Sequence, residues 1–371
     1  MYELCALLAR SVQSPALRIV AIGGAATLVA GFVVGTWITK SPLPPPPDPK
    51  KILADGGKYV VSKDGKRNVE YFVAGSMSPS AIVCILVAGG GLTGRGIALL
   101  TDESAQRRNI RIIAVSIPGC GLGTIYHGCN YSDWPSTDVL PVLEEEHVGR
   151  FVVAGSSLGT PYAMSIAHAF GPERVLALGV RVPFLPKALS DAAGVKPYRG
   201  VTSDSMLHTA LPCGWLAHLV MWALFHPRLA GRLDALTHGD AYWRCHSEYP
   251  GEMAIVYADK KRAGAHYGHK AMLVNTARST VLEWGFDPRD IRVRKKLLWY
   301  SKDDTDVPPE HGRWLGEQWT GSADEPADVI VHAFDGYGHL GGGCVEWDAF
   351  LGELSGLCRA AAPRMASLTR G

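Results

Sequence analysis

The stretch Gly155-Ser156-Ser157-Leu158-Gly159 decides how this chain is expected to fold. Apolar, β-prone residues 150–154 precede it, and residues 160–170 after it have helical spacing. A serine with glycines two positions before and two after, at the turn from a strand to a helix, is the pattern of a nucleophile elbow. This setting separates the motif from a chance match in a chain with 42 glycines. The tight turn predicts a positive φ for Ser157, a costly conformation for a residue with a Cβ.

Two later strands are each followed by a side chain that a nucleophilic serine needs. A serine attacks at neutral pH only with the help of a base, and the base needs an acid to orient it. Residues 295–301 have the composition of a strand and lead into Lys302-Asp303-Asp304-Thr305-Asp306-Val307-Pro308. Residues 327–334 indicate another strand and lead into Asp335-Gly336-Tyr337-Gly338-His339-Leu340. We therefore expect an acid and a histidine at the sheet edge that carries Ser157.

These motifs together resemble the serine hydrolases of the α/β-hydrolase family, over roughly residues 58–360. In that family the nucleophile, acid and histidine follow in this order along the chain. The resemblance implies a mostly parallel, twisted sheet flanked by helices, with a helical cap inserted after the sixth strand. It also implies that Ser157 is the nucleophile, His339 the base and Asp304 the orienting acid.

For two of these roles, the acid and the histidine, the sequence offers more than one candidate residue. The family's acid precedes an x-x-Val-Pro stretch, which favours Asp304 over Asp303 and Asp306. We interpret those two as solvated loop charges, with either as the substitute for Asp304. The family's histidine lies in a Gly-His-Leu turn, which favours His339 over His332, a residue inside the predicted strand.

The oxyanion of such a reaction needs two backbone N–H donors. The first is expected from Leu158, which follows the nucleophile. The second is expected from the loop after the strand at residues 81–87, where the family usually has His-Gly and this chain has Ala88-Gly89. We expect Gly90 to supply the donor, with Gly91 as the alternative.

The same loop also matches a dinucleotide-binding fingerprint, Gly89-x-Gly91-x-x-Gly94. That site needs an acid about 20 residues on, at the end of the next strand, to hold the ribose. The next predicted strand, residues 110–115, ends instead in Ser116-Ile117. The fingerprint is therefore disfavoured, and we expect no cofactor.

The composition is that of a folded enzyme core. The chain has 371 residues, of which 47% are hydrophobic, and a formal charge of +2. Since no basic stripe with interleaved aromatic residues occurs, no nucleic-acid partner is expected. The eight cysteines are scattered without metal-ligand spacing, and the histidines show no HExxH-like pattern, so no metal is expected.

The N-terminal part predicts a membrane anchor. Residues 1–18 form a tail, and residues 19–39 carry no charge over about the length of a membrane-spanning helix. Residues 40–57 are a proline-rich linker. This arrangement resembles single-pass, membrane-anchored α/β-hydrolases of plants, and we expect the endoplasmic reticulum membrane. A cleaved signal peptide and a mitochondrial import sequence are the alternatives.

The globular part divides into a core with an insertion. We expect the first part of the core at residues 58–182, a helical cap at 183–292, and the second part of the core at 293–371. Within the cap, residues 215–226 are apolar on nearly all sides. Such a helix packs between cap and core, or it forms a hydrophobic wall for an acyl chain or dips into a membrane.

Two functions follow from these expectations. The first is a membrane-anchored serine hydrolase that cleaves an ester, with a lipid or another apolar acyl compound as substrate. The second is a hydrolase-like protein without turnover that binds a lipid or a partner. The second is motivated by departures from the family pattern at Ala88, Ser116, Ile117 and Thr160. All three catalytic side chains are present, which ranks the hydrolase first.

Overall fold

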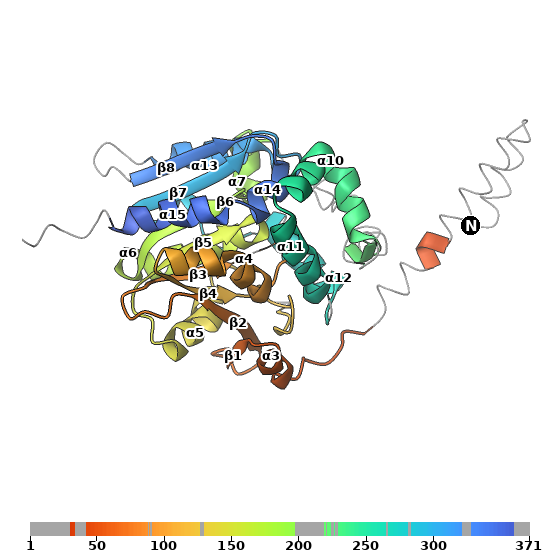
Figure 1. Ribbon diagram of the computed structural model, residues 1–371, viewed down its shortest axis with the longest axis horizontal. Coiled ribbons are helices and arrows are strands. Elements are labelled where there is room, and N and C mark those ends of the chain that lie inside the picture. Colours follow the sequence, from red (N-terminus) through yellow and green to blue (C-terminus); the bar gives the residue numbers. More distant parts are fainter. Residues whose placement is uncertain are drawn as a thin grey trace, which may run out of the picture.

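A computed structural model gives the architecture. It describes residues 30–33, 42–87, 89, 91–126, 130–196, 219, 221–223, 226, 229–264, 266–280, 283–320 and 328–359. An eight-stranded sheet runs through the centre, and helices lie on both of its faces (Figure 1).

The sheet is mostly parallel, as expected. In spatial order its strands are β1 (Lys58–Val61), β2 (Asn68–Gly75), β4 (Ile110–Val115), β3 (Ile82–Val87), β5 (Phe151–Ser156), β6 (Val175–Arg181), β7 (Lys295–Ser301) and β8 (Asp328–Phe334). Only the pairs β1–β2 and β2–β4 are antiparallel, and the other five pairs are parallel. The carboxyl ends of β3 to β8 therefore meet at one edge.

The sheet separates two hydrophobic cores, because successive side chains of a strand point to opposite faces. In the central strand β3, Ile85 and Val87 enter one core, whereas Cys84 and Leu86 enter the other. The first core is covered by α5 (Leu140–Glu145), α6 (Thr160–Arg174) and α13 (Pro309–Trp319). The second is covered by α4 (Gly94–Arg107) and α15 (Trp347–Arg359).

The insertion between β6 and β7 is helical where the structure describes it. Its helices are α7 (Lys187–Ala192), α10 (Ala230–Glu248), α11 (Pro250–Ala263) and α12 (His269–Thr280), followed by the 3₁₀ turn η3 (Pro288–Asp290). A cap after the sixth strand was expected from the family resemblance. Most of the apolar segment 215–226 lies outside the described residues.

The remaining elements are short. They are the helix α3 (Lys50–Ala54), the π-helical turn η1 (Pro135–Val139), the 3₁₀ turn η2 (Ser157–Gly159) and the helix α14 (Gly338–Cys344). The helix α3 lies inside the predicted linker, residues 40–57, and its Ile52 is fully buried. That part of the predicted linker is therefore packed on the core, because Ile52 has an apolar surface to cover.

The predicted anchor cannot be followed here. Of residues 19–39 only 30–33 belong to the described part of the chain, and the tail at residues 1–18 lies outside it. Among the described residues, no helix combines the length and the apolar character needed to cross a bilayer.

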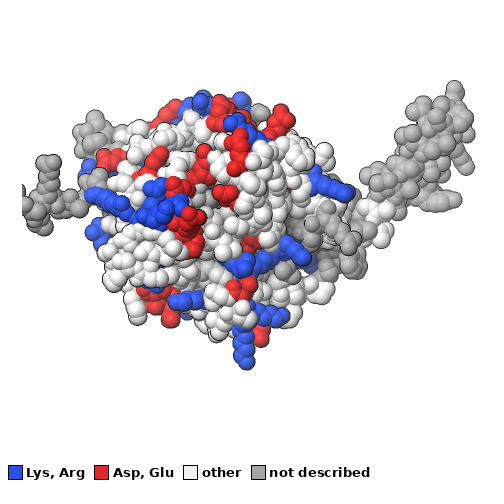
Figure 2. All heavy atoms as spheres, in the orientation of Figure 1, with Lys and Arg blue, Asp and Glu red and all other residues white. Residues whose placement is uncertain are grey.

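Charges of both signs are interspersed on the face of the molecule that Figure 2 shows. Lysines and arginines lie beside aspartates and glutamates, with uncharged surface between them. This mixture is typical of an ordinary solvated enzyme surface.

Truncating a central core side chain tests the two-core arrangement. Ile85→Ala removes a fully buried side chain from β3 and leaves a cavity, so we expect a loss of about 2–5 kcal/mol in the free energy of unfolding. The matched control is Val61→Ala on the edge strand β1, where the side chain is 51% exposed and the expected loss is below about 0.5 kcal/mol. Denaturant titration of both variants measures the difference, and equal losses would contradict the arrangement.

Candidate active site

The turn after β5 has the strained geometry expected of a nucleophile elbow. Ser157 has a φ of 50°, which confirms the prediction from the glycine spacing. A Cβ on Gly155 would lie 2.5 Å from the carbonyl oxygen of Gly159 and 2.7 Å from Cβ of Ala163. Only glycine therefore allows β5 and α6 to approach this closely. The helix that follows is interrupted at Gly171, where the backbone leaves the helical region, as the sequence also indicated.

The three predicted catalytic side chains converge at the carboxyl edge of the sheet. Ser157 Oγ lies 2.8 Å from His339 Nε2, and His339 Nδ1 lies 2.8 Å from Asp304 Oδ2. Ser157 follows β5, Asp304 follows β7 and His339 lies in α14 after β8. With the ring neutral and its proton on Nδ1, Nε2 accepts the hydrogen bond of the serine hydroxyl. The arrangement is thus able to remove the proton of Ser157.

Asp304 is held in place by the backbone that follows it. Its Oδ1 accepts hydrogen bonds from the N–H groups of Asp306 and Val307, both at 2.8 Å, which leaves Oδ2 for the imidazole. The carboxylate is buried. This geometry explains why the x-x-Val-Pro pattern identifies Asp304, because the turn that it encodes supplies the two donors.

Asp303 is exposed, as expected of a solvated loop charge, and it also has a structural role. It accepts hydrogen bonds from the Ser301 hydroxyl and from the N–H groups of Gly336 and Gly338. It therefore ties the loop after β7 to the loop that carries His339. The contact between the two loops could not be predicted from local spacing, because Gly336 and Gly338 lie 33 and 35 residues from Asp303 along the chain.

His332, the rejected alternative, lies away from the serine. It is on β8, 45% of its side chain is exposed, and its Nε2 lies 2.8 Å from Glu353. Its position inside the strand explains the difference, since only a residue beyond the strand end reaches the sheet edge.

The charges around His339 favour its protonated form. Burial lowers the pKa of the ring, but the charge of Asp304, the hydrogen bond to Asp304 and the charge of Asp306 outweigh it and raise the pKa to about 9. His238 on the cap helix α10 interacts electrostatically with the same groups. Its pKa is lowered, mainly by burial; the charge of His339 lowers it further, and the charge of Asp306 opposes the shift. His339 is therefore a base whose neutral form increases as the pH rises toward 9.

The loop after β3 lies directly against the Leu158 amide. A Cβ on Gly89 would lie 2.5 Å from Leu158 N and 2.6 Å from Gly159 N, so the two backbones touch. The alternative donor Gly91 has a φ of 95°, and the predicted donor Gly90 lies outside the described residues. The loop is thus positioned beside the first predicted donor, Leu158.

The topology of the sheet explains why these loops form a crevice. The strand β3 lies between β4 and β5 in the sheet. The chain continues from β3 to its neighbour β4 on one side, whereas β5, which comes later in the sequence, lies on the other side. Such a switch point separates the loops beyond the carboxyl ends of a parallel sheet. The loop after β3 and the serine after β5 flank that opening.

The sequence pattern of the α/β-hydrolase family matches residues 84–353, which include the elbow, the acid and the histidine. The chain belongs to the α/β-hydrolase family. A search among curated proteins found no match.

Several solved structures share this fold. An esterase from Rhodococcus sp. ECU1013 is 16% identical, with a TM-score of 0.58 over 82% of this chain and 99% of that one. A 2-hydroxy-6-oxo-6-phenylhexa-2,4-dienoate hydrolase from Rhodococcus sp. strain RHA1 is 14% identical, with a TM-score of 0.56 over 82% and 99%. A bacterial membrane phospholipase A is 16% identical, with a TM-score of 0.53 over 91% and 97%.

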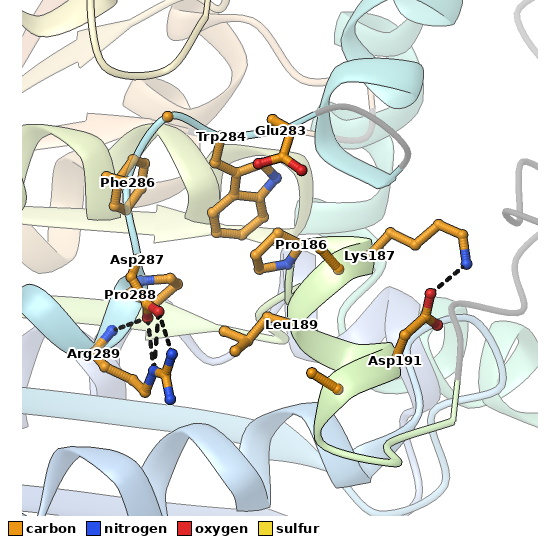
Figure 3. A pocket seen from close by; sticks show the side chains of 13 residues that line it. Pro186, Lys187, Leu189, Asp191, Glu283, Trp284, Phe286, Asp287, Pro288 and Arg289 are labelled. Atoms are coloured by element: carbon orange, nitrogen blue, oxygen red, sulfur yellow. Dashed lines mark hydrogen bonds and ion pairs between the residues drawn. The ribbon is translucent and has the colours of Figure 1, made fainter.

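A hollow of about 600 Å³ lies elsewhere, between α7 and residues 283–289 (Figure 3). Its two cationic side chains are each paired with a carboxylate, Lys187 with Asp191 and Arg289 with Asp287. None of the described residues that line it is Ser157, His339 or Asp304, so the hollow is separate from the site of the three converging side chains. Within the described ranges, no cluster of three or more His, Cys, Asp or Glu side chains is arranged to hold a metal ion.

The pairing of His339 with Asp304 predicts how stability depends on pH. Because the pKa of His339 is raised from 6.5 to about 9 in the folded protein, the resulting stabilisation is complete below pH 6.5 and is lost as the pH rises through 9. In Asp304→Asn the pKa of His339 should fall, and the stability difference from the wild type should shrink between pH 6.5 and 9. NMR titration of the ring and denaturant unfolding at each pH measure both effects. The control is Glu353→Gln, which removes the partner of His332 and should leave the pKa of His339 unchanged. An unchanged pKa of His339 in Asp304→Asn would contradict the assignment.

Proposed function

We propose that this α/β-hydrolase is a serine hydrolase that cleaves a carboxylic ester through a covalent acyl-enzyme. The observation that carries the proposal is the continuous hydrogen-bonded path from Ser157 through His339 to Asp304. A nucleophile, a base and an orienting acid at these distances are the requirements for acyl transfer.

The reaction proceeds in two halves. His339 Nε2 takes the hydroxyl proton while Ser157 Oγ attacks the ester carbonyl, and Asp304 stabilises the imidazolium that forms. The tetrahedral oxyanion accepts hydrogen bonds from the Leu158 amide and from Gly90 in the loop after β3. The alcohol leaves with the proton from His339. Water then attacks the acyl group, gives its proton to His339, and Ser157 regains a proton as the acid departs.

We further propose that the substrate is a lipid or another apolar acyl ester, and that residues 19–39 anchor the enzyme in the endoplasmic reticulum membrane. The path of the linker supports this arrangement: His266 Nε2 lies 2.7 Å from the carbonyl oxygen of Pro45, and Pro47 is buried. The linker thus contacts the cap between α11 and α12 before it leaves the globular part (Figure 1).

The cap also carries exposed apolar side chains. On α10, Leu236 is 80% exposed and Trp243 is 64% exposed. Large apolar side chains at such exposure are costly in water and suit contact with lipid. Their presence on the domain that the linker touches supports a cap that faces the bilayer.

Three of the four departures from the family pattern that motivate the alternative without turnover have structural roles. The Ser116 hydroxyl donates to Glu70 and accepts from Gly94 N, and Ile117 is fully buried. The Thr160 hydroxyl donates to the carbonyl oxygen of Ser157 and so supports the elbow. The fourth departure, Ala88, lies outside the described residues.

A fluorophosphonate probe tests the hydrolase. The wild-type protein should be labelled at Ser157, and Ser157→Ala should lose labelling and about 10⁴- to 10⁶-fold in kcat. The melting temperature should stay close to wild type, because alanine must adopt the same strained φ as serine. Absence of labelling in a folded wild-type sample would reject the proposal.

Deleting residues 1–41 tests the anchor. The shortened protein should stay in the supernatant when membranes are sedimented, and it should still hydrolyse a soluble nitrophenyl ester, because the elbow and its partners are retained. If the shortened protein remains bound, Leu236→Ser with Trp243→Ser identifies the cap as a second contact. A full-length protein that is not membrane-bound would contradict the anchor.

A further inference from the structure

The cap helix α11 reaches the loop that carries the predicted oxyanion donor. Asp259 on this helix receives both hydrogen-bond donors of Thr93: the N–H donates to Oδ2 at 2.6 Å and the hydroxyl donates to Oδ1 at 2.9 Å. Thr93 is fully buried and Asp259 is 1% exposed. A carboxylate that receives two donors from one residue fixes both the position and the orientation of that residue.

The start of α4 is shaped around this contact. Thr93 is the N-cap of α4, and its hydroxyl oxygen accepts from the N–H groups of Arg95 and Gly96. A Cβ on Gly96 would overlap the carboxylate of Asp259, so glycine is required for the approach of the cap. Residues of both α4 and α11 are therefore adapted to the contact between core and cap.

A second residue of α11 reinforces the first. Arg262 donates to the Thr93 hydroxyl at 3.0 Å and makes two hydrogen bonds to Glu70, at 3.1 and 2.9 Å. Glu70 is fully buried on β2 and also accepts from the Ser116 hydroxyl at 2.6 Å, which in turn accepts from Gly94 N. Both ends of the turn at residues 93–94 are thus connected to α11.

Stability alone does not account for Asp259. Burial raises the pKa of its carboxyl group, although the Thr93 donors and the charge of Arg262 oppose the shift, and the charge of Glu70 adds to it. A raised pKa means that ionisation at neutral pH costs folding free energy. The two hydrogen bonds from Thr93 instead indicate that this carboxylate fixes the geometry of the loop.

We infer that Asp259 and Arg262 are positioning residues, which hold the loop after β3 against the Leu158 amide so that both oxyanion donors are aimed before substrate binds. Of the described residues of this loop, Gly89 touches Leu158 N, and Thr93 is held by α11. Donors fixed in advance stabilise a developing charge without reorganisation. The inference rests on the proposed hydrolase.

The test compares two cap carboxylates by steady-state kinetics on a nitrophenyl ester. Asp259→Asn should lower kcat by roughly 10- to 100-fold with little change in KM, less than the 10²–10³ seen when an oxyanion donor is removed outright. Its melting temperature should fall, because the amide can accept from only one of the two Thr93 donors. The control is Asp234→Asn, a buried carboxylate on α10 that binds Lys260 and Tyr257 of α11 and makes no contact with the loop. It should keep kcat within about threefold.

A trifluoromethyl ketone provides the readout that a merely structural role would not change. It forms a tetrahedral oxyanion adduct with the serine, so its affinity should fall in Asp259→Asn by the same factor as kcat/KM. Thr93→Ser keeps both donors and should behave as wild type, whereas Thr93→Ala should resemble Asp259→Asn. This pair decides the question if Asp259→Asn does not fold.

The outcomes separate the two proposals. An active wild type in which Asp259→Asn or Thr93→Ala loses no more kcat than Asp234→Asn overturns the positioning role and leaves the hydrolase standing. A loss confined to KM, or an unchanged ketone affinity, overturns it as well. A wild type that neither reacts with fluorophosphonate nor turns over an ester overturns both.

Discussion

The backbone conformation of Ser157 is the constraint on which the rest of the site depends. A positive φ at a residue with a Cβ costs on the order of 1–3 kcal/mol and persists only where its surroundings impose it. Here β5 is paired on both sides, Gly155 allows α6 to close on the strand, and the Ser156 hydroxyl donates to Gly343 O in α14. The last contact links the elbow directly to the helix of His339, so serine and imidazole share one support.

The three converging side chains of the candidate site could be predicted from the sequence because each belongs to a local pattern. Glycine spacing identified Ser157 and its strained turn, and the stretches around Asp304 and His339 follow strands whose ends meet at one edge. The alternation of strands and helices predicted the parallel sheet, and the family resemblance predicted the helical cap. In each case a few consecutive residues determine the local backbone geometry, so the pattern can be recognised from the sequence alone.

The residues that support the site could not be predicted, because their partners are far away in the chain. Asp259 lies 166 residues from Thr93, and Arg262 lies 192 residues from Glu70. No spacing encodes such a pair, and an acid on a cap helix is normally a solvated charge. The same reason applies to Asp303. The packing of α3 was missed because its single buried residue, Ile52, follows two lysines and lies next to a proline-rich stretch.

The order of these elements along the chain has a consequence for biosynthesis. A nascent polypeptide that has emerged through β6 already contains Ser157, yet α11, Asp304 and His339 are still to be translated. The core sheet is also incomplete at that stage, because β7 and β8 add to its growing edge only after the cap. Translation thus delivers Ser157 first and Asp304 and His339 last, so the proposed acyl transfer requires that the final strands have closed the fold.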